Sequence, residues 1–427
     1  MVRFPPSKLG NGPEADVNGQ AAMSIGWNTY DPPSEVCVQY GTSPDALSLQ
    51  QCSGSSMTYD TSRTTANAVT LSGLAPATTY YYKVSSTNST VKHFFSPRAP
   101  GDKTPFAVNA VIDLGVYGVD GFTIQNDMSK RDLIPHIQPA LNHTTIGRLA
   151  TTIDDYELVL HPGDFAYADD WYLKQKNALH GAKAFQAILE NFYDQLAPIA
   201  GRKPYMVGPG NHEALLRFGP TMPTAFASTS ADEAARVNAN KARMLARPPF
   251  WFSFEYGMRA LRRAGQQLEF LEADLASVDR AVTPWVIVSG HRPWYTTGSE
   301  PCKPCQAAFE PLLYKYGVDL GVFGHVHNSQ RFQPVYAGRP DPNGLADPKA
   351  PMYIVAGGAG NIEGLSGVGT KRPAFSAFAY ADDFSYGQVS FLDANRLRVD
   401  FIRSATGETL DTSVLYKSHT ERFVVQA

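Results

Sequence analysis

The stretch His161-Pro162-Gly163-Asp164-Phe165-Ala166-Tyr167 follows a short apolar run at 158–160. An apolar run that stops at Gly-Asp predicts a buried strand that delivers a carboxylate into the loop at its carboxyl end. Open α/β sheets bind their ligands at this end of the strands. A single Gly-Asp pair is usually an ordinary turn, so the inference depends on whether other strands end in the same way.

Four other apolar runs end close to glycine and polar residues. They lie at 108–112, 204–207, 285–289 and 320–323, and each is soon followed by a side chain of a type that binds metal ions. A neighbouring glycine lets the backbone approach closely. These coincidences predict one site at the strand ends, formed by Asp113, Asp164, Tyr167, Asn211, His212, His291, His325 and His327.

The side chains of this set are of two kinds as metal ligands. The oxygen donors of Asp113, Asp164 and Tyr167 suit a trivalent ion such as Fe(III). The amide of Asn211 and the histidine imidazoles suit a divalent ion such as Zn(II), Fe(II) or Mn(II). Because one carboxylate shared between two cations can hold them a few ångström apart, the set predicts two unlike metal half-sites.

The segment Gly324-His325-Val326-His327 has two interpretations. On a strand, His-x-His points its imidazoles to opposite faces, which would give one core and one surface histidine. In a loop just past a strand, the same spacing can direct both rings at adjacent metals. Four of the ten histidines lie at these strand ends, which favours metal binding. The other histidines, such as His93 and His419, are expected to be ordinary surface residues.

Composition excludes several classes of partner. The formal net charge is −3, which gives no basic face for nucleic acid. No apolar run approaches the roughly 20 residues of a membrane-spanning helix, so no membrane partner is expected. The first six residues, Met1-Val2-Arg3-Phe4-Pro5-Pro6, have no apolar region typical of a signal peptide.

The cysteines nevertheless indicate an oxidising compartment. They form two spaced pairs, Cys37 with Cys52 and Cys302 with Cys305, and Asn88 and Asn142 lie in glycosylation sequons. Taken with the predicted metal chemistry, these features favour a secreted glycoprotein whose leader is missing from this sequence. Whether Cys37 bonds to Cys52 stays open at the level of sequence.

The motif Cys302-Lys303-Pro304-Cys305 could be a redox site or half of a zinc site. A zinc site would need a second Cys or His pair nearby, and a redox site would need the motif at the start of a helix after a strand. Neither context is evident in the sequence. We therefore expect a small disulfide that pins a surface loop after His291.

Residues 1–100 are predicted to form a separate β domain. Strand-like runs at 22–27, 35–40 and 79–84 alternate with Gly, Pro, Ser and Asp turns. The stretch at 74–82 resembles the L-x-P-x-T-x-Y-x-Y pattern of fibronectin type III domains. Such a β-sandwich is usually a scaffold or an interaction module. It contains no catalytic set of residues.

A Pro- and Gly-rich segment at 96–102 marks the domain boundary, and strands alternate with helices beyond it. Residues 105–345 are predicted to form a catalytic domain, and residues 346–427 its carboxy-terminal part. A glycine run at 357–360 lacks the Lys and Ser/Thr of a phosphate loop and is expected to be a tight turn. Two predicted helices, 182–197 and 266–278, place apolar residues on one core face: Phe185, Ile188, Leu189, Phe192 and Leu196 in the first, and Leu268, Leu271, Leu275 and Val278 in the second.

The motifs in their order carry a family resemblance. They are Asp113-x-Gly115, Gly163-Asp164-x-x-Tyr167, Gly210-Asn211-His212-Glu213, His291 after a strand, and Gly324-His325-x-His327. This set resembles the purple acid phosphatases of the metallophosphoesterase superfamily, most closely the larger fungal members with a fibronectin-like amino-terminal domain. The resemblance covers nearly the whole chain. It implies an α/β metallophosphoesterase domain in which two mixed sheets pack together under flanking helices.

The resemblance also implies a role for each residue. Fe(III) would be held by Asp113, Asp164, Tyr167 and His327, and a divalent metal (Zn, Fe or Mn) by Asp164, Asn211, His291 and His325. Tyr167 would be the phenolate whose charge transfer to iron gives the colour. His212 would be a catalytic acid rather than a ligand, protonating the leaving alkoxide.

The implied activity is that of an acid phosphatase that hydrolyses small-molecule phosphate monoesters, with phytate among the candidate substrates. The two metals would activate a water or hydroxide nucleophile. The intact ligand set favours this enzyme. A phosphodiesterase remains a second possibility, because the same metal site does not encode the type of ester. The oligomeric state is not encoded either.

Two departures from the family pattern bear on function. Plant members have further histidines soon after the one matching His291, whereas residues 292–297 contain none, so substrate preference does not transfer. The segments after Glu213 and Met258 are short, and a core strand is expected to be missing there. Losing a central strand exposes unpaired edges and removes buried apolar area.

Two explanations compete for the missing strand. One is a mis-spliced or truncated gene, which the missing leader favours, and it would give an unstable or non-catalytic phosphatase-like protein. The other is a divergent chain that fills the gap with the basic segment 259–265.

Overall fold

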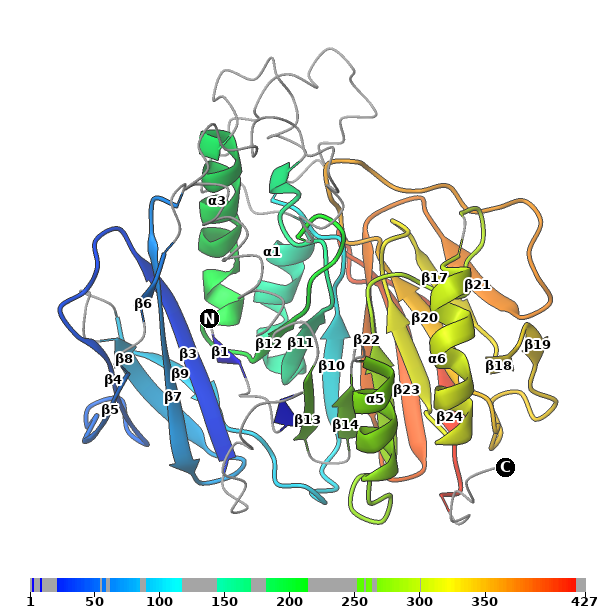
Figure 1. Ribbon diagram of the computed structural model, residues 1–427, viewed down its shortest axis with the longest axis horizontal. Helices are drawn as coiled ribbons and strands as arrows, with labels where there is room; N and C mark the ends of the chain where they lie inside the picture. Colours follow the sequence, from blue (N-terminus) through cyan, green and yellow to red (C-terminus); the bar gives the residue numbers. More distant parts are fainter. Residues whose placement is uncertain are drawn as a thin grey trace.

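The computed structural model describes residues 2–3, 8–9, 21–53, 56–58, 62–84, 90–116, 144–169, 182–213, 252–256, 259–262, 267–299 and 301–419. Figure 1 shows a β-rich unit at one side, coloured blue, and a larger α/β unit that carries the rest of the chain. None of the helices in these ranges combines the length and hydropathy that a membrane span needs.

The amino-terminal unit is a sandwich of two four-stranded antiparallel sheets, as the sequence predicts. In β7 (Thr65–Leu74), buried and exposed residues alternate, which is the pattern of a strand with one face on a core. Buried Met23, Val38, Leu71 and Phe94 fill the space between the sheets. The remaining strands are β1 (Val2–Arg3), β3 (Ala21–Thr29), β4 (Val36–Gly41), β5 (Leu49–Ser53), β6 (Ser56–Met57), β8 (Thr79–Val84) and β9 (Lys92–Phe95).

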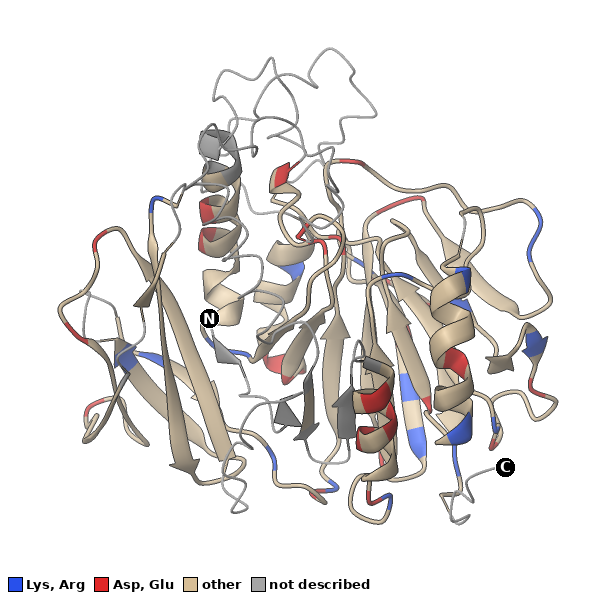
Figure 2. Ribbon diagram, viewed as in Figure 1, with Lys and Arg blue, Asp and Glu red and all other residues tan. Residues whose placement is uncertain are grey.

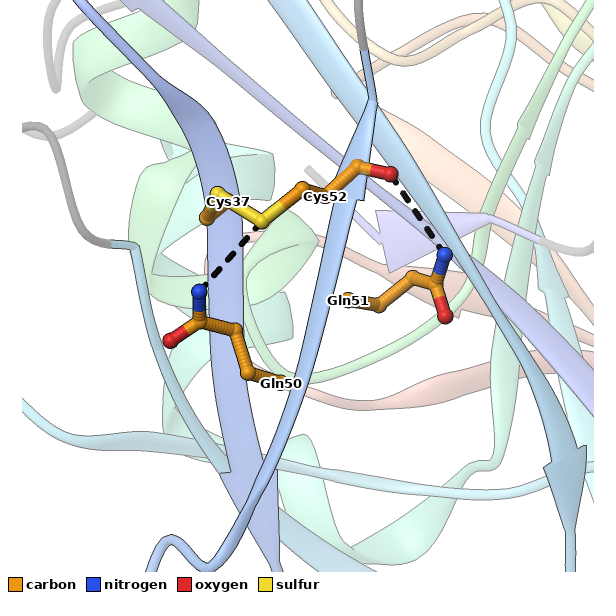
Figure 3. The surroundings of a disulfide bond; sticks show 4 residues. All are labelled: Cys37, Gln50, Gln51 and Cys52. Atoms are coloured by element: carbon orange, nitrogen blue, oxygen red, sulfur yellow. Dashed lines mark hydrogen bonds between the residues drawn. A yellow bond between two sulfur atoms is a disulfide. The ribbon is translucent and has the colours of Figure 1, made fainter.

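A disulfide joins β4 to β5 in this sandwich. Cys37 and Cys52 stand directly opposite each other in the antiparallel pair and are bonded, as Figure 3 shows. The side-chain amide of Gln50 donates a hydrogen bond to Sγ of Cys52 at 3.4 Å. The pairing that the sequence left open is therefore present in the structure.

The larger unit contains two mixed sheets. The six-stranded sheet has the order β12-β11-β10-β22-β23-β24 and the eight-stranded sheet the order β2-β13-β14-β15-β16-β20-β17-β21. The first comprises β12 (Tyr205–Val207), β11 (Leu158–His161), β10 (Phe106–Ala110), β22 (Ser385–Phe391), β23 (Arg396–Arg403) and β24 (Thr409–Tyr416). The second comprises β2 (Lys8–Leu9), β13 (Phe252–Tyr256), β14 (Arg259–Arg262), β15 (Trp285–Ser289), β16 (Leu320–Phe323), β20 (Met352–Ala356), β17 (Ser329–Phe332) and β21 (Ser376–Tyr380), and a small ribbon pairs β18 (Val335–Tyr336) with β19 (Arg339–Pro340).

Helices cover the outer faces of both sheets (Figure 1). Leu158, Ile287 and Val389 belong to one core shared by strands of both sheets. The helices α1 (Thr144–Thr151) and α3 (Ala182–Ala200), with the 3-10 turn Ile153–Asp155, pack on a second core with the six-stranded sheet. The helices α5 (Gln267–Ala276) and α6 (Lys303–Lys315) pack on a third core with the eight-stranded sheet. The predicted two-sheet architecture is confirmed.

The two predicted helices exist, with one error on their core faces. In α3, Ile188, Phe192 and Leu196 are buried, while the side chain of Phe185 lies outside the described residues. In α5, Leu271 and Leu275 are buried, but Leu268 is 41% exposed, so its predicted core position is wrong. Leu268 is in the first turn of the helix, next to its amino-terminal end, where the packed face has not yet begun.

The parallel strands set the position of the site. β10, β11 and β12 run parallel in one sheet, and β14, β15, β16 and β20 run parallel in the other. All five strands expected to deliver the site residues are present. Figure 2 shows acidic residues, in red, in the loops at the carboxyl ends of the central strands. The strand ends of the two sheets therefore meet at one place, where the predicted ligands gather.

The expectation of a missing core strand is wrong. β14, which lies in the basic segment after Met258, pairs in parallel with β15 from Arg259↔Trp285 to Arg262↔Val288. Its other edge pairs antiparallel with β13. The backbone groups at the edge of β15 are thus paired by the segment 259–262. This is the second of the two explanations, in which a divergent chain fills the gap with its basic segment. Residues 214–251, which include most of the other short segment, lie outside the described residues.

A buried charge cluster fixes the opposite ends of β15 and β16. Asp319 is fully buried, and its Oδ2 accepts hydrogen bonds from Nη1 of Arg280 at 2.6 Å and from the backbone N–H of Val286 at 2.8 Å. Nζ of Lys417 and Nε2 of His419 each lie 3.8 Å from Oδ1. The side chain of His419 is only 6% exposed, so its expected surface position is wrong.

Replacing this carboxylate gives a pH-dependent loss of stability. Burial alone would raise the pKa of Asp319, but Arg280, His419 and Lys417 hold it below its ordinary value of 3.8. Asp319→Asn should lower the free energy of unfolding by about 3 kcal/mol at neutral pH, because it leaves buried cations unpaired. Since the folded-state pKa is the lower one, this stabilisation is present above about pH 4 and is lost as the pH falls below it.

Urea unfolding between pH 3 and pH 7 measures the effect. The control is Asp383→Asn, whose side chain is 53% exposed and should change stability by less than about 0.5 kcal/mol. The ion-pair account would be contradicted if the difference in the free energy of unfolding between wild type and Asp319→Asn stayed the same down to pH 3.

Candidate metal centre

Four of the predicted ligands have left-handed backbone. The φ angles are 60° at Asp113, 56° at Asp164, 53° at Tyr167 and 67° at His325. Only eight described residues other than glycine have positive φ, and these four make up half of them. Such conformations are unfavourable for residues with a Cβ and persist only where surrounding contacts hold them. The backbone is therefore strained where the predicted ligands lie.

Asp113, Tyr167 and His327 form one cluster. Asp113 follows β10, Tyr167 lies in the loop after β11, and His327 follows β16. The phenol of Tyr167 donates to Oδ1 of Asp113 at 3.0 Å and lies 3.0 Å from Nε2 of His327. Nδ1 of His327 hydrogen-bonds to the carbonyl of Gly364 at 3.1 Å, which directs Nε2 towards the cluster.

Asp164, Asn211, His291 and His325 form a second cluster. Nε2 of His291 lies 2.9 Å from Oδ2 of Asp164 and 3.2 Å from Oδ1 of Asn211. The rings of His291 and His325 have centroids 5.1 Å apart. One ligand atom from each of Asp164, His291 and His325 falls within 4.8 Å of the others. The two clusters lie side by side, because Nε2 of His291 is also 3.9 Å from Oδ1 of Asp113.

The second cluster has buried polar atoms without hydrogen bonds. Oδ2 of Asp164 and Nδ1 of His291 are buried and have no hydrogen-bond partner, even though Oδ2 is close to a ring nitrogen of His291. Buried polar atoms are normally satisfied, and such orphans call for a ligand or ion. Carboxylate and imidazole donors converging in this way fit a divalent cation.

The electrostatics of both clusters also fit a cation. Burial and then the charge of Asp164 raise the pKa of Asp113, and burial and then Asp113 raise the pKa of Tyr167. Burial lowers the pKa of His327 to about 4 and, with His291 and Arg292, that of His325 to about 3. Buried carboxylates and neutral imidazoles are the protonation states that bind metals best once a cation is present to compensate the charge.

Close packing explains the glycines of the motifs. A Cβ on Gly210 would lie 2.1 Å from Oδ1 of Asp164, and one on Gly324 would lie 2.6 Å from Oδ2 of Asp113. A Cβ on Gly357 would lie 2.3 Å from the carbonyl oxygen of Val326 and 2.6 Å from Oδ2 of Asp113. The glycine run at 357–360, expected to be only a tight turn, is therefore packed against a site carboxylate.

Glu213 fixes the loop that carries Asp164. Its Oε2 accepts hydrogen bonds from the backbone N–H groups of Asp164 at 2.7 Å and Gly210 at 2.8 Å, and its Oε1 accepts one from Phe165 at 2.7 Å. Burial, and then the charge of Asp164, raise its pKa to about 7. His161 supports the same loop from below. It is fully buried, with Nδ1 bonded to the hydroxyl of Tyr205 at 2.8 Å, so it is no surface histidine.

His212 lies beside both Asp164 and Tyr167. Its backbone N–H donates to Oδ1 of Asp164 at 2.8 Å, and its ring lies 4.2 Å from that of Tyr167. Nδ1 is 2.8 Å from Oδ1 of Asp169. Nε2 lies 3.9 Å from Oδ2 of Asp164 and 3.9 Å from Oε1 of Glu363.

Two of these partners were not predicted from the sequence. Asp169 lies two residues after Tyr167, and Glu363 also lies 3.8 Å from Nε2 of His327. Glu363 follows β20, just as the other site residues follow their strands. A search for polar residues after apolar runs would have found it, but the glycine run at 357–360 was interpreted only as a turn. Asp169 lies in the loop that already supplies Asp164 and Tyr167.

The second predicted disulfide is present, in an unexpected setting. Cys302 and Cys305 are bonded, and Cys302 caps the amino terminus of α6. The expectation that the motif does not open a helix is therefore wrong, although Pro304 in the first turn of α6 is a residue typical of a helix start. The backbone N–H of Cys302 donates to the carbonyl of Pro293 at 2.8 Å, so the disulfide holds the loop after His291, as predicted. The sequons at Asn88 and Asn142 lie outside the described residues.

The chain is similar to proteins of known families. The family described as "Purple acid Phosphatase, N-terminal domain" matches residues 13–98, "Calcineurin-like phosphoesterase" matches 132–329, and "Iron/zinc purple acid phosphatase-like protein C" matches 350–412. The protein named acid phosphatase A of Cryphonectria parasitica is 56% identical, over 96% of this chain and 92% of the relative. The chain belongs to the purple acid phosphatase family.

More distant relatives match over similar lengths. Purple acid phosphatase 22 of Arabidopsis thaliana is 28% identical over 92% of this chain and 81% of its own. A Hordeum vulgare protein named nucleotide pyrophosphatase/phosphodiesterase is 28% identical over 77% of this chain and 88% of its own. Among solved structures, purple acid phosphatase PPD1 of yellow lupin (Lupinus luteus) covers 93% of this chain and 72% of its own, with 22% identity and a TM-score of 0.71.

Family membership makes the chain a metal-dependent acid phosphatase that acts on small phosphate esters, as predicted. The alignment with the Cryphonectria parasitica protein spans 465 positions, which exceeds the 427 residues of this chain. The relative therefore contains segments that this purple acid phosphatase lacks.

The packing of Gly357 gives a prediction for the site. Gly357→Ala should lower the free energy of unfolding by about 2 kcal/mol, because its Cβ meets a backbone carbonyl that cannot move freely, and should displace Asp113. Gly367→Ala is the matched control, because no atom lies within 4 Å of its Cβ position. Urea unfolding and the iron content of the purified variants measure both effects. Equal stability and equal iron in the two variants would show that the contact with Asp113 does not matter.

Proposed function

We propose that the chain hydrolyses phosphate monoesters at a centre of one Fe(III) and one divalent metal. Asp113, Asp164, Tyr167 and His327 would hold the iron, and Asp164, Asn211, His291 and His325 a Zn, Fe or Mn ion. The observation that carries the proposal is the separation of the donors into two adjacent clusters, one with a buried phenol and one with two imidazoles. Asp164 contacts residues of the second cluster while lying beside the first.

When bound, the two cations would supply a hydroxide nucleophile and neutralise charge on the phosphate. The protein's own acid would be His212. The carboxylate of Asp169 at Nδ1 would orient the ring, so that Nε2 would serve as the donor to the leaving alkoxide. Glu363, 44% exposed and 3.9 Å from that nitrogen, would line the entrance on the same side.

The substrate class and location remain part of the proposal. Phytate is included among the candidate monoesters. The two disulfides support secretion, because such bonds persist in oxidising compartments. A phosphodiesterase is the second candidate, supported by the match to the Hordeum vulgare protein named for that activity. The unstable, non-catalytic alternative loses its main support because β14 fills the sheet.

Metal content and visible absorption of the purified chain test the proposal, together with hydrolysis of a monoester and a diester at acid pH. We expect about one iron and one divalent metal per chain, with the monoester preferred. Asp164→Asn should lower kcat/KM at least about 100-fold, because it removes the carboxylate nearest both clusters. A folded protein without metal and without turnover would rule out the proposed activity, and a preference for the diester would support the second candidate.

The phenol gives a separate optical prediction. Tyr167→Phe should abolish the tyrosinate-to-iron absorption band, because no other described tyrosine is within hydrogen-bond distance of both Asp113 and His327. Tyr193→Phe, at a tyrosine that is 43% exposed on α3, is the matched control and should keep the band. A band that persists in Tyr167→Phe would refute the assignment of iron to this cluster.

A further inference from the structure

The loop that follows His291 and the segment that follows His327 are joined by buried side-chain amides. Gln330, on β17, and Asn328 are both fully buried. Oε1 of Gln330 accepts the backbone N–H of Thr297 at 2.7 Å, and its Nε2 donates to Oδ1 of Asn328 at 2.7 Å. One amide therefore contacts both the loop of the second cluster and the residue that follows the ligand His327 of the first.

The direction of these hydrogen bonds is fixed at both ends of the network. A backbone N–H can only donate, so the atom that faces Thr297 is the oxygen of Gln330. Asn328 then presents its own oxygen to Gln330 and donates through Nδ2 to the carbonyl of Ser366 at 3.1 Å. A carbonyl can only accept, so this end agrees with the other. Nε2 of Gln330 also donates to Oγ1 of Thr296 at 3.1 Å, which uses its second hydrogen.

Ser366 connects the network to His327. Its backbone N–H donates to the carbonyl of His327 at 2.9 Å, and its Oγ accepts the backbone N–H of His327 at 3.2 Å. Two residues earlier, the carbonyl of Gly364 lies 3.1 Å from Nδ1 of His327, which directs Nε2 towards the hydroxyl of Tyr167. Both the backbone and the ring of His327 are therefore bound by the segment that the amides hold.

The two loops also contact each other directly. Gly298 lies in the loop after His291 and has a φ of 81°. A Cβ on Gly298 would lie 2.5 Å from the carbonyl oxygen of Gly367 and 2.7 Å from the backbone nitrogen of Gly369. Because backbone packs against backbone at this point, neither loop can shift without moving the other. The amide of Gln330 therefore helps to set the distance between them.

We propose that Gln330 is a positioning residue that fixes His327 of the first cluster relative to the loop of the second. It acts on His327 through Asn328 and Ser366, and on the other loop through its acceptor oxygen. The inference rests on the proposed function in one respect, that His327 holds iron. A residue that orients a metal ligand strengthens metal binding, so the network should slow the loss of iron and set the geometry of its bond to Tyr167.

Variants at the two ends of the network test the inference. Gln330→Met has a similar size and removes the amide, whereas Ser366→Ala removes the hydroxyl that contacts His327. In the iron-loaded protein, each should shift the tyrosinate-to-iron absorption band and raise the rate of iron loss to a chelator about 10-fold, because each frees the ligand from its support. Ser366→Thr keeps the acceptor oxygen and should retain the wild-type band and rate.

The double variant separates positioning from a general loss of packing. If both changes break one path, Gln330→Met combined with Ser366→Ala should lose iron no more than about threefold faster than either single variant, whereas independent effects would multiply to about 100-fold. Gln388→Met is the matched control. Gln388 donates to Oδ1 of Asn109 at 3.0 Å, an amide pair between β22 and β10, and its loss should leave the band and the rate unchanged.

Crystal structures of the same variants give a readout that does not depend on metal. In Gln330→Met, Nδ1 of His327 should lie more than about 3.5 Å from the carbonyl of Gly364, so that this hydrogen bond is lost. Asn328→Ala breaks the same path and gives the same test if Gln330→Met does not fold. The inference is overturned if His327 keeps this bond in the folded variant, or if the effects of the two single variants multiply. A wild type that binds no iron would contradict the proposed function alone, since the position of His327 would still decide the inference.

Discussion

The position of Asp164 is the constraint on which the rest of the site depends. Its carboxylate must reach His291 from the other sheet while its backbone adopts a left-handed conformation, with φ of 56°. Three features make this possible: the carboxylate of Glu213 binds the N–H of Asp164, Gly210 leaves room for Oδ1, and His161 lies beneath the loop. Each sheet contains a group of parallel strands, and the carboxyl ends of the two groups bring these loops together. The fold therefore supplies strained, desolvated donors that a cation would stabilise.

Much of the site can be predicted from the sequence, because each of its residues lies close in the chain to the end of a strand. Each predicted ligand comes at or soon after a short apolar run, so strand ends and ligands could be found together, and the five strands are where the apolar runs predict them. The same rule, applied to β20, would have included Glu363. What the sequence could not show is which side chains meet. Nothing local to Asp169 indicates that it bonds to Nδ1 of His212, because that contact joins two loops.

The errors also have physical causes. Leu268 fits the helical period of α5, but the period does not say where packing begins along the helix. His419 is expected at the surface, yet it contacts a buried carboxylate and the ring of Trp285. The basic segment 259–262 lacks the apolar pattern of a core strand, and it is backbone pairing with β15 that places it in the sheet. Long-range contacts decide each of these positions.

Anomalous X-ray scattering from crystals of the purified protein, collected on both sides of the iron edge, tests the central claim most directly. The account predicts two metal peaks about 3.5–4 Å apart, with iron beside Tyr167, Asp113 and His327, a second metal beside Asn211, His291 and His325, and Asp164 between them. A single metal, or iron bound among the histidines with the phenol of Tyr167 uncoordinated, would contradict it.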